Sequence, residues 1–176
     1  PWQSLNTYMI TQELVKKYFN YKDGELIWSK TTSRLAIAGS QAGTIDNKGY
    51  ISIGINNKEY LLHRLIFMYH KGYFPSYVDH IDNNPLNNKI ENLRPATISQ
   101  NAYNARLKST NKSGVKGVSW DKKSNKWRAQ CSLNGKAQLL GFYDKLSDAK
   151  VMVEKYRNKY HKEFARHAWH FIFRVL

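Results

Sequence analysis

The stretch VDHIDNNPLNNKIENLR runs from Val78 to Arg94 and decides how the middle of this chain folds. Its start suits a short strand over residues 77–81, and the polar segment over residues 82–89, with its Asn-Pro pair, suits a loop. Residues 92–95 suit a return strand. The stretch therefore predicts two strands joined by an asparagine-rich loop.

A helix is expected next, over residues 97–107, with Thr97 or Ser99 as its N-terminal cap. Asp79 and His80 are adjacent near the end of the first strand, where a regular backbone would point their side chains to opposite sides. Chemistry that needs both side chains at one phosphate therefore requires the strand to twist or end there.

A hairpin that faces the helix would bring Asp79 and His80 near Asn101. The oxygens of Asp and Asn side chains are hard ligands that suit Mg²⁺, which takes its other ligands from water and a substrate phosphate. A neighbouring imidazole can take a proton from the water that attacks this phosphate. The three residues therefore predict metal-assisted hydrolysis of a phosphodiester.

The pattern D-H-I-D-x-N-x-x-x-N-x-x-x-N-L-R, followed by an asparagine in the first turns of a helix, resembles the HNH endonucleases, or ββα-metal nucleases. The resemblance is to phage and intron homing endonucleases, in the variant whose last His is Asn. It implies that His80 is the general base and Asp79 a metal ligand. It also implies that Asn92 holds the loop and orients the His80 ring, and that Asn101 is the second metal ligand.

Asparagine at position 101, where the commonest pattern of the family has His, changes the expected metal. An amide oxygen suits Mg²⁺ or Mn²⁺ better than zinc. We therefore expect Mg²⁺ as the cofactor, with Mn²⁺ able to substitute. Asn104, one helical turn further on, competes with Asn101 for the role of ligand.

The other polar residues of the loop are expected to shape its turns, as Asp and Asn commonly do. These residues are Asp82, Asn83, Asn87 and Asn88. The alternative is that Asp82 or Asn88 braces the site.

Arg94 lies in the expected return strand and Arg106 near the end of the expected helix. Either could contact DNA phosphates, or pair with Asp82 and Glu91 instead. His63 and His70 are seven residues apart, too far along a helix to share one small ion without other ligands, so packing or a phosphate contact is favoured for them.

Amphipathic and alternating patterns organise the residues before the quoted stretch. A short helix is expected over residues 11–19 and a strand over 24–29. A hairpin is expected from the strands 51–55 and 58–62, and a buried helix over 61–72.

The C-terminal third carries most of the net charge of +15, because residues 106–167 hold sixteen Lys and Arg against five Asp and Glu. Three strands are expected, over residues 115–121, 126–133 and 136–144, followed by a helix over 147–164. A basic folded unit of this kind is typical of proteins that bind a polyanion, most commonly nucleic acid.

The segment SGVKGVSWDKKSNKWRAQCSLNGKAQLLGFYDKLSDAKVMVEKY resembles the AP2/ERF DNA-binding domain in its G-V, K-W-x-A and L-G-x-[FY] landmarks. In that family a three-stranded sheet lies in the major groove. This chain departs from it at Ser119, where Arg is common, and at Leu139, where Trp is common. The DNA contacts that the resemblance implies are Lys116, Ser119, Trp120, Arg128, Gln130, Lys136 and Gln138.

The whole pattern predicts an α+β fold: a ββα-metal (HNH) nuclease domain, preceded by a small helix and hairpin region and followed by a three-stranded antiparallel sheet with one helix. The predicted divisions are an N-terminal extension (1–9), the nuclease domain (10–107), a linker (108–114), the AP2/ERF-like domain (115–167) and a C-terminal tail (168–176).

The expected function is that of a site-specific endonuclease of the homing type, acting on double-stranded DNA as a monomer without a protein partner. Alternatives are a non-catalytic AP2-like regulator with a decayed nuclease domain, or an HNH nuclease of restriction or defence. The single cysteine excludes an internal disulfide. Neither a membrane span nor a secretion signal is evident, so an intracellular protein is expected, in a bacterial host if it is phage-encoded.

Overall fold

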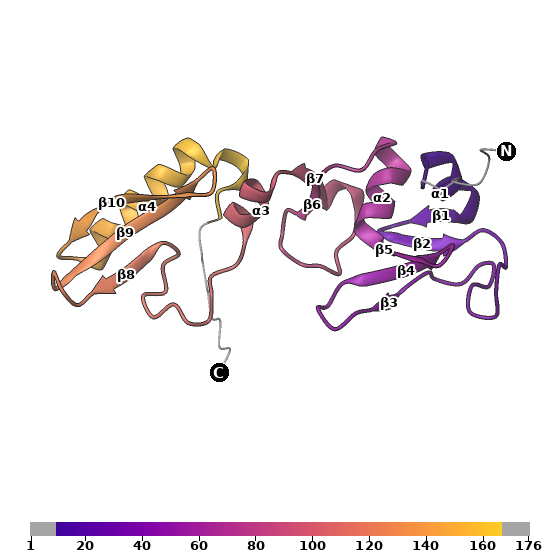
Figure 1. The fold of residues 1–176 in the computed structure, drawn as a ribbon, viewed down its shortest axis with the longest axis horizontal. Coiled ribbons are helices and arrows are strands. Elements are labelled where there is room, and N and C mark those ends of the chain that lie inside the picture. Colours follow the sequence, from indigo (N-terminus) through magenta and orange to yellow (C-terminus); the bar gives the residue numbers. More distant parts are fainter. Residues whose placement is uncertain (1–9, 167–176) are drawn as a thin grey trace, which may run out of the picture. The chain divides into compact units, whose positions relative to one another are not determined.

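The computed structural model describes residues 10–166, and the chain divides into two compact units, Pro1–Ala96 and Thr97–Leu176 (Figure 1). Each unit is described by itself. The expectations for an extension over residues 1–9 and a tail over 168–176 lie outside the described residues.

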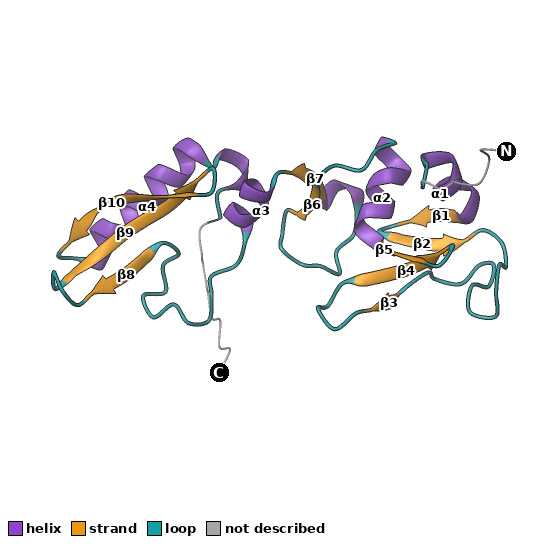
Figure 2. Ribbon diagram, in the orientation of Figure 1, coloured by secondary structure: helices purple, strands orange, loops and turns teal. Residues whose placement is uncertain are grey.

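The first unit combines two main helices with three small antiparallel sheets (Figure 2). The sheets pair β1 with β2, β3 with β4 and β5 in the order β3-β4-β5, and β6 with β7. In chain order the elements are α1 (Gln12–Tyr18), β1 (Phe19–Lys22), β2 (Glu25–Trp28), β3 (Thr44–Ile45), β4 (Ile51–Ile55), β5 (Lys58–Leu61), α2 (Leu62–Lys71), β6 (Tyr77–His80), a 3₁₀ turn η1 (Ile90–Asn92) and β7 (Leu93–Ala96).

Local sequence signals account for several boundaries in this unit. Thr11 caps α1 by accepting a hydrogen bond from the Leu14 amide, and Gly72 ends α2 in the left-handed conformation. Asn56 and Asn57 both have positive φ, at 48° and 60°, which the tight turn between β4 and β5 requires. The hairpin and the helix predicted over residues 51–72 are confirmed.

Helix α2 forms the centre of the first unit's core, because its apolar side packs against α1 and the neighbouring strands. Phe19 and Trp28 pack ring to ring, with centroids 4.5 Å apart, beside this helix. The fully buried core side chains include Val15, Phe19, Leu26, Ile53, Leu62, Leu65, Ile66 and Phe67. This packing fixes α2, and thereby fixes the direction of the His63 side chain in its first turn.

The second unit has one three-stranded antiparallel sheet, in the order β10-β9-β8, and two helices (Figure 2). Its elements are α3 (Ile98–Asn104), β8 (Val118–Asp121), β9 (Lys126–Leu133), β10 (Lys136–Tyr143), α4 (Leu146–Tyr160) and a 3₁₀ turn η2 (Lys162–Phe164). The three predicted strands and the helix after them are all present.

Helix α4 covers one face of this sheet. Val118, Ala129 and Cys131 form a buried cluster with Ala149 and Val153 of the helix. Because side chains alternate along a strand, the residues between these positions point to the other face, which α4 leaves open. We call this second side the open face; it carries the side chains of Ser119, Arg128, Gln130, Leu139 and Phe142, as the strand register shows.

A glycine is required where the chain enters β8. Gly117 has φ +82°, and a Cβ there would lie 2.4 Å from the backbone oxygen of Gln130. The close approach lets the Gln130 amide donate to the Gly117 oxygen at 2.8 Å. The G-V landmark at Gly117 and Val118 therefore has a steric cause.

Helix α3 lies in the second unit, whereas the sequence grouped it with the nuclease domain up to residue 107. Thr97 and Gln100 form a capping box at its start, as expected for Thr97. Part of the predicted linker over residues 108–114 is also tied down, because Asn111 and Ser113 donate hydrogen bonds to the Val118 backbone oxygen.

Candidate active site and nucleic-acid interface

The hairpin of β6 and β7 places Asp79 and His80 at the end of a strand. Asp79 pairs with Arg94 across the hairpin and His80 with Leu93. Both side chains are buried, with 5% and 6% of their surface exposed. Strand β6 stops at His80, whose backbone oxygen accepts from the Asn83 amide at 2.9 Å and begins the loop.

The His80 ring is held by a side chain of the loop itself. Its Nε2 lies 3.0 Å from Oδ1 of Asn88, a residue that is 2% exposed. The Asn88 amide nitrogen faces the Leu86 oxygen, so the amide oxygen faces the ring. An amide oxygen only accepts, so the neutral ring carries its proton on Nε2 and its lone pair on Nδ1. The contact with Asn88 therefore favours the neutral tautomer that is protonated on Nε2.

Two more rings lie close to that of His80, one from His63 in α2 and one from Tyr50 just before β4. The His63 ring centroid lies 4.9 Å from that of His80, at 64° to it, and the Tyr50 centroid lies 6.2 Å away. Burial, with a smaller contribution from His80, lowers the pKa of His63 to about 3, so His63 is neutral at neutral pH. The packing role favoured for His63 agrees with this contact, but its partner was not predicted.

Asn92 makes hydrogen bonds across the loop. Its amide nitrogen donates to Asp82 Oδ1 at 2.9 Å and to the Asn87 backbone oxygen at 2.8 Å. Its oxygen accepts from the Asp82 amide at 3.1 Å. Burial raises the pKa of Asp82, but hydrogen bonds from Asn84, Asn87 and Asn92 outweigh burial and lower it. Asp82 and Asn92 are therefore the centre of the loop's hydrogen-bond network.

Asp79 forms an ion pair with Arg94. Nε and Nη2 of Arg94 each lie 2.8 Å from Oδ2 of Asp79, and both side chains are largely buried. Asp82, Glu91 or a phosphate was the partner expected for Arg94 from the sequence. The pairing with Asp79 was not predicted. The arginine compensates the charge of a carboxylate that would otherwise be buried at a cost of several kcal/mol.

The other predicted members of the site belong to the second unit. Asn101 is exposed on α3, and Arg106 follows the end of this helix. Asn104, the competing ligand, is buried. The first unit thus brings together Asp79, His80, Asn92 and Arg94 of the predicted site.

The two ligands expected from the sequence, Asp79 and Asn101, each offer only hard oxygens, which suit a magnesium ion better than a zinc ion. Within residues 10–166, no group of three or more His, Cys, Asp and Glu side chains is arranged to hold a metal. A magnesium ion needs few protein ligands, because water and substrate phosphate complete its coordination.

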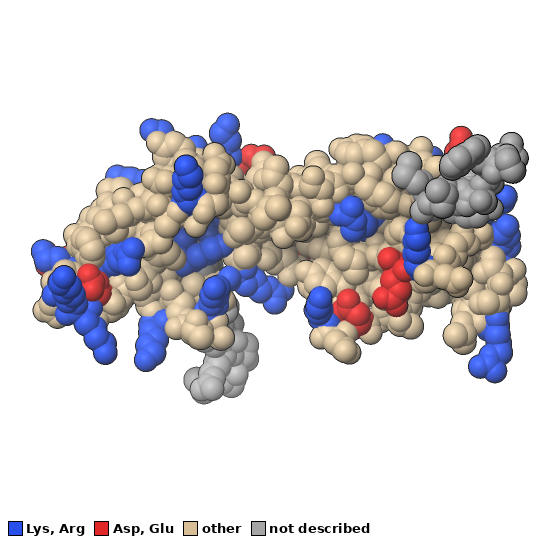
Figure 3. Space-filling view, viewed as in Figure 1, with Lys and Arg blue, Asp and Glu red and all other residues tan. Residues whose placement is uncertain are grey.

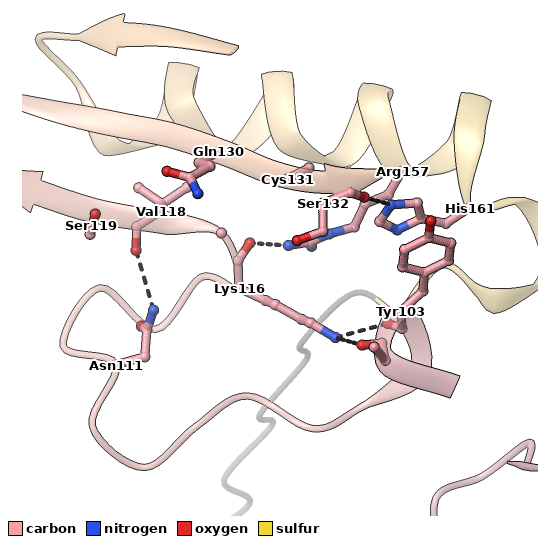
Figure 4. Close-up of a pocket in the computed structure, with 12 residues that line it drawn as sticks. Tyr103, Asn111, Lys116, Val118, Ser119, Gln130, Cys131, Ser132, Arg157 and His161 are labelled. Carbon is pink, nitrogen blue, oxygen red and sulfur yellow. Dashed lines mark hydrogen bonds between the residues drawn. The ribbon is translucent and has the colours of Figure 1, made fainter. Parts of the chain in front are cut away.

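Helix α3 is anchored within the second unit by one lysine and one aromatic stack (Figure 4). The Lys116 ammonium donates to the oxygens of Tyr103 at 2.8 Å, Ala105 at 2.5 Å and Ala102 at 3.3 Å, at the helix end where carbonyls lack partners. The Tyr103 ring stacks on His161 with centroids 3.7 Å apart. Burial, with a contribution from Arg157, lowers the pKa of Lys116 to about 8. Lys116, expected as a DNA contact, thus caps α3.

A pocket of about 400 Å³ lies beside this anchor, between the end of α3 and the strands β8 and β9 (Figure 4). Buried Arg157 donates to the Lys116 backbone oxygen at its edge. Ser119 and Gln130 of the open face also line it.

Three of the predicted DNA contacts share the open face of the sheet. Ser119 lies directly opposite Arg128 in the register, and Gln130 follows two residues along β9. The sequence predicted this alternation on β9. These three side chains can reach one nucleic-acid surface together.

Three other predicted DNA contacts lie on the opposite face of the sheet, the face that α4 covers. Trp120 pairs with Trp127 across the strands, and their rings meet edge to face with centroids 5.0 Å apart. By register, Lys136 and Gln138 also lie on the α4 side of the sheet. The structure therefore does not group them with Arg128 on the open face.

Positive charge is spread over the second unit. Figure 3 shows Lys and Arg side chains standing out around the β8, β9 and β10 region, with few acidic ones among them. Residues 106–167 hold sixteen Lys and Arg against five Asp and Glu. This surplus favours a polyanionic partner.

Comparison with known proteins agrees with the geometry of the hairpin. A sequence model of the HNH endonuclease family matches residues 60–103. The matched segment runs from β5 through the β6–β7 hairpin and into α3. It includes Asp79, His80, Asn92 and Asn101.

Phage and viral proteins are similar to this chain. Protein 3.8 of Escherichia phage T7 is 38% identical over 96 residues, which are 54% of this chain and 76% of that protein. Two uncharacterised HNH endonucleases of Acanthamoeba polyphaga mimivirus are 46% identical over 77 residues and 30% identical over 169 residues. These matches cover 42% and 91% of this chain, but only 38% and 46% of the mimivirus proteins.

The chain therefore contains an HNH endonuclease domain and has phage and viral homologues. No solved structure matches it. None of the helices within the described part of the chain is long and apolar enough to cross a membrane.

Proposed function

We propose that this protein is a site-specific DNA endonuclease of the homing type, which hydrolyses phosphodiester bonds with one divalent metal ion and a histidine base. The observation that carries the proposal is the buried His80 ring, whose Nε2 lies 3.0 Å from Asn88 Oδ1, next to Asp79 on the hairpin that matches the HNH family. Double-stranded DNA is the proposed substrate.

In the proposed reaction, His80 Nδ1 takes a proton from water as the water oxygen attacks phosphorus. The bond between phosphorus and the 3′ oxygen breaks, and the leaving 3′ oxygen takes a proton from a solvent water, which gives a 5′ phosphate and a 3′ hydroxyl. Asp79 and Asn101 would hold Mg²⁺, for which Mn²⁺ can substitute. When bound, the ion supplies positive charge that stabilises the phosphorane-like transition state and the leaving oxygen. Asn92 keeps the loop closed, so that Asn88 stays against the ring.

Replacing Asn88 by Ala should lower the nicking rate roughly 10- to 100-fold, because the His80 ring loses the partner that selects its tautomer. DNA affinity should stay unchanged, since Asn88 is buried and meets no solvent-exposed ligand. Single-turnover nicking of supercoiled plasmid and DNA binding in EDTA measure the two effects separately.

Asn84→Ala is the matched control, because Asn84 is an asparagine of the same loop. Its side-chain oxygen accepts a hydrogen bond from the Leu86 amide, and its backbone amide donates to Asp82. Asn88→Asp should recover part of the rate, because a carboxylate oxygen also accepts from Nε2. Equal loss in the Asn84 and Asn88 variants would show that loop integrity, and not the ring contact, accounts for the effect.

We propose that the second unit supplies most of the DNA affinity, through its open face and surrounding Lys and Arg. Affinity should then fall at least about 100-fold between about 50 and 200 mM salt, because each phosphate contact releases counterions. Fluorescence anisotropy in EDTA measures this without cleavage.

Arg128→Ala should flatten the dependence of log affinity on log salt by about one unit of slope if Arg128 contacts a phosphate, and should leave the slope unchanged if it contacts only a base. A dependence that is flat for the wild type would contradict the proposed role of this unit.

A further inference from the structure

The open face of the second unit's sheet exposes two large apolar side chains. Leu139 is 55% exposed and Phe142 is 41% exposed. Both lie on β10, on the side that α4 does not cover, because their cross-strand partners Gln130 and Arg128 alternate with the buried Ala129. Neighbouring exposed apolar side chains on an otherwise polar, basic surface are a feature of interaction sites.

Each apolar residue stands next to a side chain that can read a base. Leu139 lies directly opposite Gln130, and Phe142 directly opposite Arg128, with Ser119 beyond Arg128 in the same row. Neighbouring strands are about 4.8 Å apart, so the side chains of one row are in reach of the same or adjacent base pairs. Gln suits adenine and Arg suits guanine in the major groove.

Thymine is the base that offers an apolar group in the major groove, the C5 methyl. The positive charge of the second unit, sixteen Lys and Arg against five Asp and Glu over residues 106–167, favours DNA as the partner that brings this methyl. The other apolar candidate, a protein surface, would have to cover Arg128 as well, and burying an unpaired arginine is costly.

We propose that Leu139 and Phe142 read thymine methyl groups in the major groove, so that the protein distinguishes thymine from uracil in the duplex it binds. Leu139 with Gln130 then favours A·T pairs, and Phe142 with Arg128 favours a thymine beside a guanine. This inference rests on the proposed DNA-binding role of the second unit and names the groups that its sheet recognises.

The test compares binding of the full chain to alternating poly(dA-dT) and poly(dA-dU) duplexes, which differ only in the thymine methyl. EDTA keeps any nuclease activity silent. Wild type should bind the thymine duplex more tightly, by about fourfold for each methyl group buried. Leu139→Ala and Phe142→Ala should each weaken binding to the thymine duplex and leave uracil binding nearly unchanged, so that the ratio of the two affinities moves towards one.

Val151→Ala is the matched control, because Val151 is an exposed apolar residue on α4, on the covered side of the sheet, and its ratio should equal that of the wild type. Equal wild-type affinity for the two duplexes, with steep salt dependence, would overturn the methyl readout and leave the DNA-binding role intact. Failure to bind either duplex would overturn both. A change of oligomeric state in the Leu139 and Phe142 variants, measured by sedimentation, with an unchanged ratio would assign the patch to contact between copies instead.

Discussion

His80→Ala should abolish metal-dependent nicking of supercoiled plasmid, with a fall in rate of at least about 100-fold, because a general base contributes about that much or more. Affinity for DNA in EDTA should remain that of the wild type, since the ring is 6% exposed and packs against Asn88 and His63. A loss of cleavage without a loss of binding would separate a catalytic histidine from a DNA contact.

His70→Ala is the matched control, because His70 is a histidine at the exposed end of α2 that packs edge-on against Tyr21. It should nick at the wild-type rate. Because His80 is buried, its replacement can also destabilise the hairpin, so thermal melting accompanies the assay and His80→Gln serves as a second variant of similar size. An Ala variant that melts normally and nicks normally would exclude His80 as the base.

Asn101→Ala should lower metal-dependent nicking roughly 10- to 100-fold and raise the Mg²⁺ concentration needed for half-maximal rate, because the metal loses one oxygen ligand. The exposed position of Asn101 on α3 and the higher helix propensity of Ala should keep the fold intact. Titrating Mg²⁺ and Mn²⁺ in single-turnover nicking measures both effects.

Asn104→Ala distinguishes the two candidate ligands on α3. Asn104 is buried, so its replacement should lower the melting temperature more than the metal affinity. Asn101→Asp and Asn101→His should recover activity, because each restores a metal-binding atom. If Asn104→Ala raises the metal requirement and Asn101→Ala does not, then Asn104 is the ligand.

Local signals in the sequence predicted much of the fold. The strand over residues 126–133 has the same bounds in the structure, because Trp127, Ala129 and Cys131 alternate strictly with polar residues. Asn134-Gly135 forms the predicted tight turn, with φ of 49° and 77°. Both signals lie within a few consecutive residues, so they can be recognised from the sequence alone.

The first strand of the N-terminal hairpin was not predicted. β1 follows α1 without a break, and its first residue, Phe19, was read as the end of the helix. Asp23-Gly24, with φ of 48° and 91°, is the turn signal that would have indicated it. Its partner strand β2 was predicted because Gly24 separates it clearly from the preceding polar residues.

Contacts between distant segments account for what the sequence did not predict at the site. The loop asparagines were given a general turn-forming role, with Asn88 as one possible brace, and no spacing rule singles out Asn88 as the partner of the His80 ring. His63 meets His80 only because the core packing of α2 directs its side chain there. The assignment of α3 to the second unit depends on Lys116 and on the Tyr103–His161 stack, which join residues far apart in the chain.

The chemistry of the cleaved ends tests the central claim most directly. Wild-type protein should nick supercoiled plasmid when Mg²⁺ is present, and DNA ligase should reseal the nick, because ligase requires a 5′ phosphate and a 3′ hydroxyl. The same incubation with His80→Ala should leave the plasmid supercoiled. Wild-type protein that binds the plasmid but leaves it intact with Mg²⁺ and with Mn²⁺, or that makes nicks ligase cannot reseal, would contradict the proposed hydrolysis.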